Sequence, residues 1–155
     1  HCISSAASDV YKRQELVAEL VSLLKVVETD MTIFFRSLGS IDGPNPLGMA
    51  HAYYNEAALP IDELGLWLGK WWSRVDGDPD RGAMNTANPK YVLRNWMSQL
   101  AIEAAEADDY SVAIELQDLL RAPYEEQSSS EDRWYKKRPE WARHKVGCSM
   151  LSCSS

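Results

Sequence analysis

The side chains best suited to chemistry in this sequence lie close to its last residue. Cys148 and Cys153 are separated by four residues, and His144 precedes Cys148 by four. Thiolate and imidazole groups bind zinc, but a structural zinc site normally closes with four ligands and this stretch supplies three. A redox role suits the thiols better, because a thiol near a chain terminus can reach a partner cysteine and its accessible thiolate is the reactive form. Two free, reduced thiols are the simpler alternative.

Other patterns that would indicate an active site are absent from the sequence. It contains no glycine-rich phosphate loop, no nucleophile elbow and no paired-histidine metal motif. The acidic run at 76–80 is superficially similar to a calcium loop but lacks the closing glutamate. Four carboxylates fall on predicted helix faces and turns, where solvation explains them: Glu103, Glu106, Asp108 and Asp109. We therefore expect no catalytic, cofactor-binding or metal-binding residue in this chain.

Charge and composition exclude two classes of partner. The net charge is −7, which disfavours binding to nucleic acid, because phosphate contacts require clustered Lys and Arg. The basic cluster at 133–145 is interrupted by Trp and Pro. No apolar run approaches the roughly 20 residues that a membrane-spanning helix needs. With six Trp in 155 residues, the sequence predicts a soluble, acidic chain with an aromatic-rich core or interface.

The most regular stretch of the sequence begins at NPKYVLRNW, residues 88–96. Asn88 has the short acceptor side chain of a helix N-cap, and Pro89 suits the first helical position, where its missing N–H costs nothing. Apolar residues then follow at helical spacing, which predicts a core helix running from Asn88 past residue 104. The stripe consists of Leu93, Trp96, Met97, Leu100, Ala101 and Ala104.

Further helices are predicted on both sides of this stretch. Residues 15–38 form either one amphipathic helix or two helices broken near Thr29 and Asp30. A second helix is expected over 60–75, and a third over 112–120 that ends before Pro123. These elements predict an all-α fold, an irregular helical bundle.

Composition divides the chain into three predicted segments. Residues 1–14 lack a hydrophobic period, and DVYKRQ at 9–14 resembles the translated end of a transposon adapter used in sequencing libraries, so we treat 1–14 as non-native. Residues 15–123 form the helical region. Residues 124–155 are expected to be a polar, mostly irregular tail ending in Cys-Ser-Ser, with one helical turn near 139–141.

Several motifs in order resemble one known family. NPKYVLRNW at 88–96, AIEAAE at 101–106 and DY at 109–110 resemble the C-terminal part of the selenoprotein O family. PYEEQ at 123–127, PEW at 139–141 and the final SCSS at 152–155 are similar to the same family in the same order, and DMTIFFR at 30–36 is similar to one of its helices. The resemblance covers about residues 15–155, and the ordered set is more specific than any single motif.

The resemblance implies a bacterial, cytoplasmic protein adenylyltransferase with a protein-kinase-like fold. Members of the family bind ATP with Mg²⁺ and transfer AMP to hydroxyl side chains of protein substrates. The groups that hold nucleotide and metal match no position here, so the chain alone is expected to bind neither and to be inactive. Its expected partners are the missing N-terminal kinase-like part of the same protein and the protein substrates. Because the family carries selenocysteine or Cys near its end, Cys153 is the expected redox-sensitive residue.

Two other functions remain open from the residues alone. Residues 101–120 resemble one tetratricopeptide unit, so the chain could be a helical protein-interaction module with no enzymatic activity. Such a module needs further units at a period of roughly 34 residues, and none is visible. A thiol redox protein centred on Cys148 and Cys153 is the other alternative, but it lacks the C-x-x-C spacing of thioredoxin-like motifs.

Overall fold

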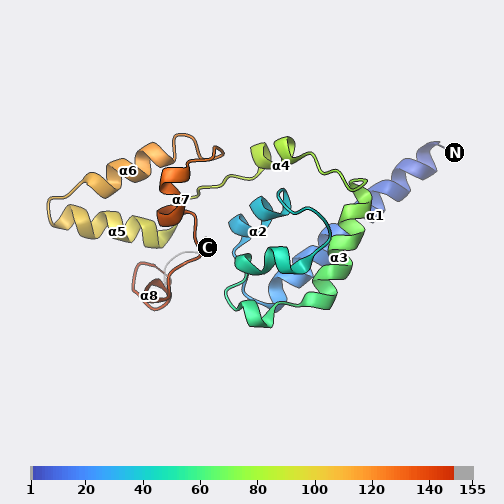
Figure 1. The fold of residues 1–155 in the computed structure, drawn as a ribbon, viewed down its shortest axis with the longest axis horizontal. Coiled ribbons are helices and arrows are strands. Elements are labelled where there is room, and N and C mark those ends of the chain that lie inside the picture. The colour runs from blue at the N-terminus through green and yellow to red at the C-terminus, as the bar shows by residue number, and fades with distance from the viewer. Residues whose placement is uncertain (1, 149–155) are drawn as a thin grey trace. The chain divides into compact units, whose positions relative to one another are not determined.

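The computed structural model describes residues 2–148, with side chains from residue 9 onward, and its regular elements are helices (Figure 1). Within that range the extended backbone pairs once, in an isolated antiparallel bridge between Thr29 and Tyr53. None of the helices described there is long and apolar enough to cross a membrane. The all-α prediction is confirmed.

The chain folds as two compact units, His1–Met84 and Asn85–Ser155. This division falls at neither of the segment boundaries predicted from composition, at residues 14 and 123. Unit 1 contains the first five helical elements and most of the sixth, which ends three residues beyond the boundary. They are α1 (Cys2–Val26), α2 (Met31–Leu38), the 3₁₀ helices η1 (Pro46–Ala52) and η2 (Glu56–Ala58), α3 (Ile61–Arg74) and α4 (Arg81–Ala87).

Two helices, rather than one, occupy residues 15–38, because Asp30 caps a new start. Its side chain accepts a hydrogen bond from the backbone N–H of Ile33 at 3.1 Å. Its own backbone N–H donates to the carbonyl of Ala52 at 2.8 Å, which holds the break against η1. The predicted interruption near Thr29 and Asp30 is therefore confirmed.

The core of unit 1 is largely aliphatic and lies where α2, η1 and α3 meet. On α3, the predicted stripe residues Leu64, Trp67 and Leu68 are buried, and the predicted helix over 60–75 is confirmed. The indole N–H of Trp67 donates to the carbonyl of Leu16 at 2.8 Å, which fastens α1 to α3. The other buried apolar side chains of unit 1 are Leu20, Ile33, Phe34, Leu38, Ile41, Met49, Ala52, Tyr53 and Leu59.

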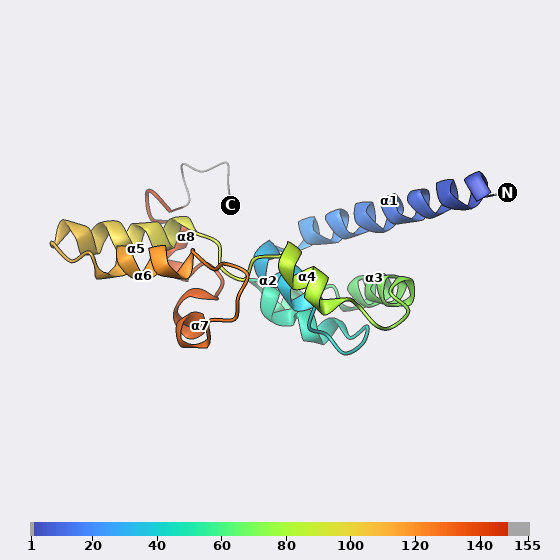
Figure 2. The same ribbon diagram turned by 90° about the horizontal axis from the view of Figure 1, so that it is seen from above.

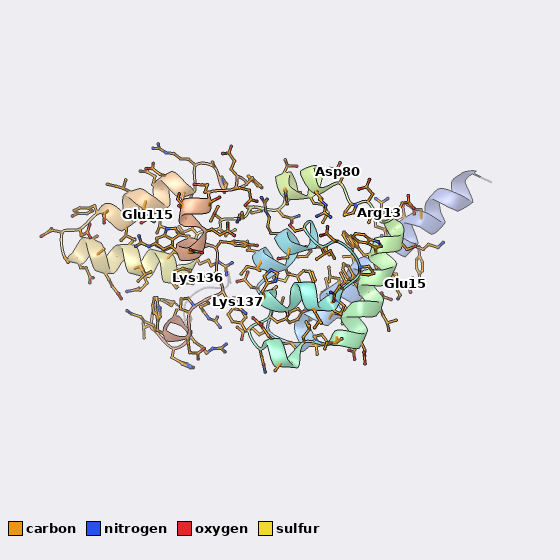
Figure 3. All side chains as sticks on the ribbon, viewed as in Figure 1. Arg13, Glu15, Asp80, Glu115, Lys136 and Lys137 are labelled. Atoms are coloured by element: carbon orange, nitrogen blue, oxygen red, sulfur yellow. The ribbon has the colours of Figure 1, made fainter. Side chains whose placement is uncertain are left out.

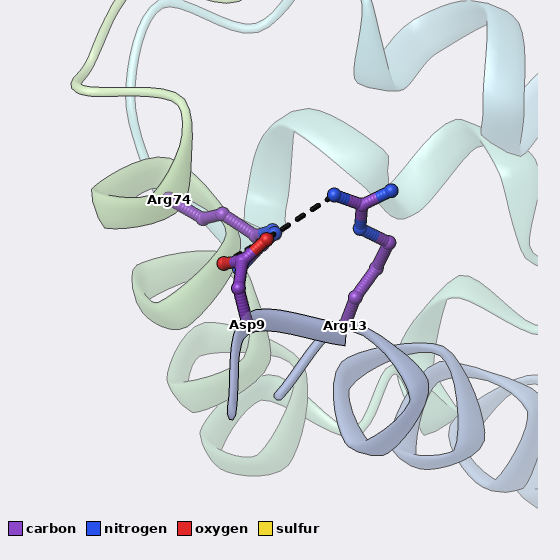
Figure 4. A network of polar contacts seen from close by, with 3 residues as sticks. All are labelled: Asp9, Arg13 and Arg74. Atoms are coloured by element: carbon purple, nitrogen blue, oxygen red, sulfur yellow. Dashed lines mark hydrogen bonds and ion pairs between the residues drawn. The ribbon is translucent and has the colours of Figure 1, made fainter. Parts of the chain in front are cut away.

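Helix α1 runs without a break through the boundary predicted at residue 14. Near its start, the carboxylate of Asp9 accepts hydrogen bonds from Arg74 at 3.0 Å and Arg13 at 3.2 Å (Figure 4). The bond from Arg74 holds the pKa of Asp9 below its usual value. The carboxylate is well exposed, so these ion pairs contribute little to stability. That residues 1–14 are non-native stays a prediction.

Unit 2 is built on a helical hairpin. Helices α5 (Asn95–Glu106) and α6 (Ser111–Leu119) run antiparallel and lie side by side in both views (Figures 1 and 2). The carboxylate of Asp109 accepts a hydrogen bond from the backbone N–H of Ser111 at 2.9 Å and so starts α6. The predicted helix over 112–120 is confirmed.

The prediction that the central helix begins at Asn88 is wrong, because α5 begins at Asn95. The backbone N–H groups of Lys90 and Tyr91 both donate to the carbonyl of Pro123, at 2.8 and 3.0 Å. This contact holds the residues before α5 in a non-helical path, and Leu93, predicted to be in the apolar stripe, is exposed. A long-range hydrogen bond outweighs the local cap signals here.

The segment predicted to be mostly irregular after residue 123 contains two short helices in the part that the structure describes, with turns and irregular backbone between them. The helices are α7 (Ser128–Trp134) and α8 (Glu140–Arg143), of which α8 confirms the turn predicted near 139–141. Both helices contribute to the core of unit 2. That core consists of Tyr91, Trp96, Met97, Leu116, Leu119, Trp134, Ala142 and Cys148.

Candidate functional site

The two thiols predicted to be redox-active differ in what the structure describes. Cys148 is 5% exposed and packs in the core of unit 2. Its backbone N–H donates to the carbonyl of Lys145 at 3.1 Å, and its carbonyl accepts from the side chain of Asn95 at 3.4 Å. Thiol exchange at Cys148 therefore requires local opening of the core. Cys153 lies outside the described residues, and its redox role stays a prediction.

His144 lies beside an open cavity on unit 2 and not in a metal-binding cluster. The cavity has a volume of about 470 Å³ and is also lined by Leu100, Glu103, Trp141 and Lys145. Lys145 forms an ion pair with Glu103 and lies 5.3 Å from the ring centroid of Trp141. Among the side chains that the structure describes, those of residues 9–148, no three His, Cys, Asp or Glu groups come together in a way that could hold a metal ion.

The carboxylates singled out in the sequence take part in local structure. Glu103 accepts hydrogen bonds from Lys145 and from Gln99, and these hold its pKa below the usual value. The hydrogen bonds from Ser111 likewise lower the pKa of Asp109. Both groups are ionised at neutral pH and cannot donate a proton as a general acid would. The remaining two of these carboxylates, Glu106 and Asp108, are exposed.

The acidic run at 76–80 forms a turn and a helix cap. Asp76 and Gly77 both have positive φ, at 53° and 72°, which reverses the chain after α3. The side chain of Asp80 then accepts a hydrogen bond from the backbone N–H of Ala83 at 2.9 Å at the start of α4 (Figure 3 labels Asp80). The predicted turn is therefore confirmed.

Lys90 is a buried charge of unit 2 that sequence reasoning missed. Its side chain is 6% exposed and forms ion pairs with Glu126 and, at 2.9 Å, with Glu131. The ammonium also lies 4.9 Å from the ring centroid of Tyr135. The neighbouring Tyr91 is buried as well. This arrangement ties the segment before α5 to the segment that contains α7.

The protonation state of Lys90 decides what it can do. Burial alone lowers the pKa of its ammonium, but the hydrogen bonds from it to Glu126 and Glu131 outweigh burial and leave the pKa above its usual value. A catalytic lysine needs the opposite shift, because the neutral amine is the base or nucleophile. Lys90 is therefore cationic at neutral pH and has a structural role.

A second polar and aromatic arrangement fastens α7 to the hairpin. The rings of Trp96 and Trp134 stack with centroids 5.8 Å apart, and the indole N–H of Trp134 donates to Glu115 at 2.7 Å. Arg133 lies over Trp134 at 4.6 Å, and Lys136 lies over Trp96 at 5.5 Å (Figure 3 labels Glu115 and Lys136). The high Trp content of the sequence indicated an aromatic core, but not which helix would supply Trp134.

Comparison with known proteins identifies the family context of these units. The chain is 45% identical over 91% of its length to a protein of Flavobacterium johnsoniae and 46% identical over 91% to one of Rhodopirellula baltica. A protein of Methylobacillus flagellatus is 45% identical over 97% of the chain. No protein-family model matches. The matches define the class first: this is a helical chain homologous to part of a nucleotidyltransferase.

More particularly, all three relatives carry the name protein nucleotidyltransferase YdiU, and the chain is homologous to a segment of this selenoprotein O family. The resemblance inferred from NPKYVLRNW and the later motifs is confirmed. The chain spans less than a third of the length of these relatives, 29% of the first and 30% of the other two.

Proposed function

We propose that this chain is the C-terminal helical part of a protein adenylyltransferase that transfers AMP from ATP to Ser, Thr or Tyr hydroxyls of protein substrates. The observation that carries the proposal is the identity of 45% over 91% of the chain to a protein named as a nucleotidyltransferase. The relatives' name supports nucleotidyl transfer, and the resemblance of the motifs supports AMP as the transferred group. The two helical units then have a supporting role beside the part that performs the transfer.

We expect ATP with Mg²⁺ to bind outside this chain. Mg²⁺ prefers carboxylate and water oxygens beside nucleotide phosphates, and among the side chains of residues 9–148 no three acidic, His or Cys groups converge. The ammonium of the buried Lys90 is already paired with the carboxylates of Glu126 and Glu131. In this proposal, nucleotide and metal bind to the part of the longer protein outside the matched segment.

A chimaeric protein tests the proposal. This chain replaces the matched segment of the Flavobacterium johnsoniae relative, and transfer of labelled AMP to protein is measured with ATP and Mg²⁺. Transfer within about tenfold of the parent relative is expected, because the segment is 45% identical. The proposal would be contradicted if the chimaera folds and hydrolyses ATP or transfers phosphate, but transfers no AMP under conditions in which the parent relative does.

We also propose that Cys153, and not Cys148, is the thiol that responds to oxidant. Burial of Cys148 in the unit 2 core supports this choice, since a buried thiol is protected from exchange. In the chimaera, Cys153→Ser should change the response of AMP transfer to hydrogen peroxide, while Cys148→Ser should leave that response intact and lower stability. An unchanged oxidant response in Cys153→Ser would remove the redox role.

A further inference from the structure

An apolar groove runs along unit 1 between the second half of α1 and the first half of α3. Its volume is about 550 Å³. The apolar lining comes from Ala18, Leu23 and Val26 on α1 and from Leu66 and Trp67 on α3. The hydrogen bond from Trp67 to the carbonyl of Leu16 holds the two helices at this spacing. We call this surface the α1/α3 groove.

Large apolar side chains in the groove are exposed to water, and burying them against a partner would be favourable. Leu66 is 71% exposed and Val26 is 68% exposed, from opposite walls. Single exposed apolar residues are ordinary, but a concave surface lined by several from two helices is the form in which partner helices are bound. None of the lining residues belongs to 1–14, so the groove does not depend on the adapter-like segment.

The rim of the groove is acidic. Glu15, Glu19 and Glu63 contribute three carboxylates, against one ammonium from Lys70 (Figure 3 labels Glu15). Lys70 is already paired with Glu19 at 2.6 Å. A matching partner therefore presents an apolar stripe flanked by Lys or Arg, because charge complementarity at the rim sets orientation and excludes other partners.

We infer that the α1/α3 groove binds an amphipathic, basic-flanked helix from the part of the longer nucleotidyltransferase that lies outside the matched segment. This inference rests on the proposed function. More than two thirds of each relative's length is outside the segment that this chain matches, so a large body of protein is available to cover the groove. A helix laid between α1 and α3 would bury the exposed walls at Leu66 and Val26 and pair its basic flanks with the acidic rim.

Thiol labelling measures whether the groove is covered. Leu66→Cys places a thiol in the groove, and Leu47→Cys places a control thiol on η1, where the parent side chain is 62% exposed and does not line the groove. Both variants are made in the isolated chain and in the Flavobacterium johnsoniae chimaera. Maleimide labelling is followed by peptide mass spectrometry, which separates these thiols from the native cysteines.

In the isolated chain, both positions should label at similar rates. In the chimaera, labelling at position 66 should slow at least tenfold, while position 47 should change less than threefold. Equal labelling rates at the two positions in the chimaera would overturn the inference. Protection of position 66 in the isolated chain that increases with protein concentration would also overturn it, because a second copy of the chain would then be covering the groove. AMP transfer by the same chimaera is measured separately. If the chimaera transfers AMP but position 66 labels freely, only the inference about the groove is contradicted. If position 66 is protected but no AMP is transferred, only the proposed function is contradicted.

Discussion

Units 1 and 2 reach a folded core by different chemistry. Unit 1 buries mainly aliphatic side chains of α2, η1 and α3, together with the charged side chains of Asp30 and Arg36 near α2. Unit 2 packs around the stacked rings of Trp96 and Trp134, and it buries the cation Lys90 between two carboxylates. Unit 1 leaves an apolar groove open to water between two of its helices, whereas in unit 2 α7 and α8 each add a side chain to the core of the hairpin.

Because the two cores differ in composition, mutations should destabilise the two units in different ways. An aliphatic core assembled from periodic helices loses stability in proportion to the volume removed. A core held by single aromatic and charged anchors depends on a few residues, because each one joins segments that are far apart in sequence. Removing one anchor from unit 2 should therefore loosen several elements at once and leave unit 1 unchanged.

The largest expected effect comes from Trp134→Ala. The ring is buried, stacks on Trp96 and donates to Glu115, so its loss should lower the free energy of unfolding of unit 2 by about 3–5 kcal/mol. Urea unfolding followed by hydrogen exchange of peptides from each unit measures the change. The half-exposed Trp141→Ala is the control and should cost less than about 1 kcal/mol. If Trp134→Ala reduced hydrogen-exchange protection equally in both units, the two units could not be unfolding independently of each other.

Lys90→Ala should cost unit 2 about 2 kcal/mol, because a buried stem and its ion pairs are lost while Glu126 and Glu131 can return to water. Lys90→Met keeps the stem and should cost about half as much. The raised pKa stabilises the fold below the unfolded-state value near 10.5, and this contribution is lost as pH rises through the folded-state pKa.

The pH dependence of stability separates the charge of Lys90 from its packing. The difference between the parent and Lys90→Met should be constant from neutral pH to about pH 10 and shrink above it. Arg121→Ala, which breaks an exposed pair with Asp118, serves as the control and should cost less than about 1 kcal/mol. A Lys90→Met protein as stable as the parent at pH 7 would show that the ion pairs contribute nothing.

A smaller and opposite effect is expected in unit 1 from Gly69→Ala. A Cβ added at Gly69 on α3 meets no heavy atom within 4 Å, so alanine should stabilise the helix by about 0.5–1 kcal/mol. Gly77→Ala is the counterpart, because Gly77 has φ +72° and its added Cβ would lie 3.2 Å from the indole nitrogen of Trp72. The midpoint temperature of thermal unfolding should rise for Gly69→Ala and fall for Gly77→Ala. A loss of stability in Gly69→Ala would mean that α3 is packed more closely there.

The smallest effect concerns the partly exposed pair of Glu103 and Lys145. Hydrogen bonds from Lys145 and Gln99 lower the pKa of Glu103, so its contribution is present above the unfolded-state pKa near 4.5 and is lost as pH falls through the folded-state value. Glu103→Gln should therefore narrow the difference in unit 2 stability between pH 7 and pH 3. Chemical unfolding at the two pH values measures this, and an unchanged difference would show that the pair is not formed in solution.

Local sequence signals predicted the helices whose boundaries are set locally. The polar pair ending at Asp30 predicted the start of α2, and the regular apolar stripe of Leu64, Trp67 and Leu68 predicted α3. The same reasoning located α6 between the turn at Asp109 and the proline at position 123. In each case the cap or the apolar period lies within the element itself, so no distant residue was needed.

Distant contacts account for what the sequence did not reveal. The cap signals at Asn88 and Pro89 started no helix, because hydrogen bonds to the carbonyl of Pro123 fix the backbone there. Helix α7 spans seven residues with Trp134 as its buried residue, which gives no periodic pattern to detect. Burial of Lys90 depends on a partner 36 residues later, Glu126, and a lysine in isolation is predicted to be solvated.

We propose that this chain supports a nucleotidyltransferase without holding the nucleotide itself, and titration calorimetry is the decisive experiment. ATP with Mg²⁺ is titrated into the isolated 155-residue chain, with the full-length Flavobacterium johnsoniae relative as the positive control. We expect no saturable heat from the isolated chain under conditions in which the relative binds ATP. Stoichiometric, Mg²⁺-dependent binding to the isolated chain would contradict it.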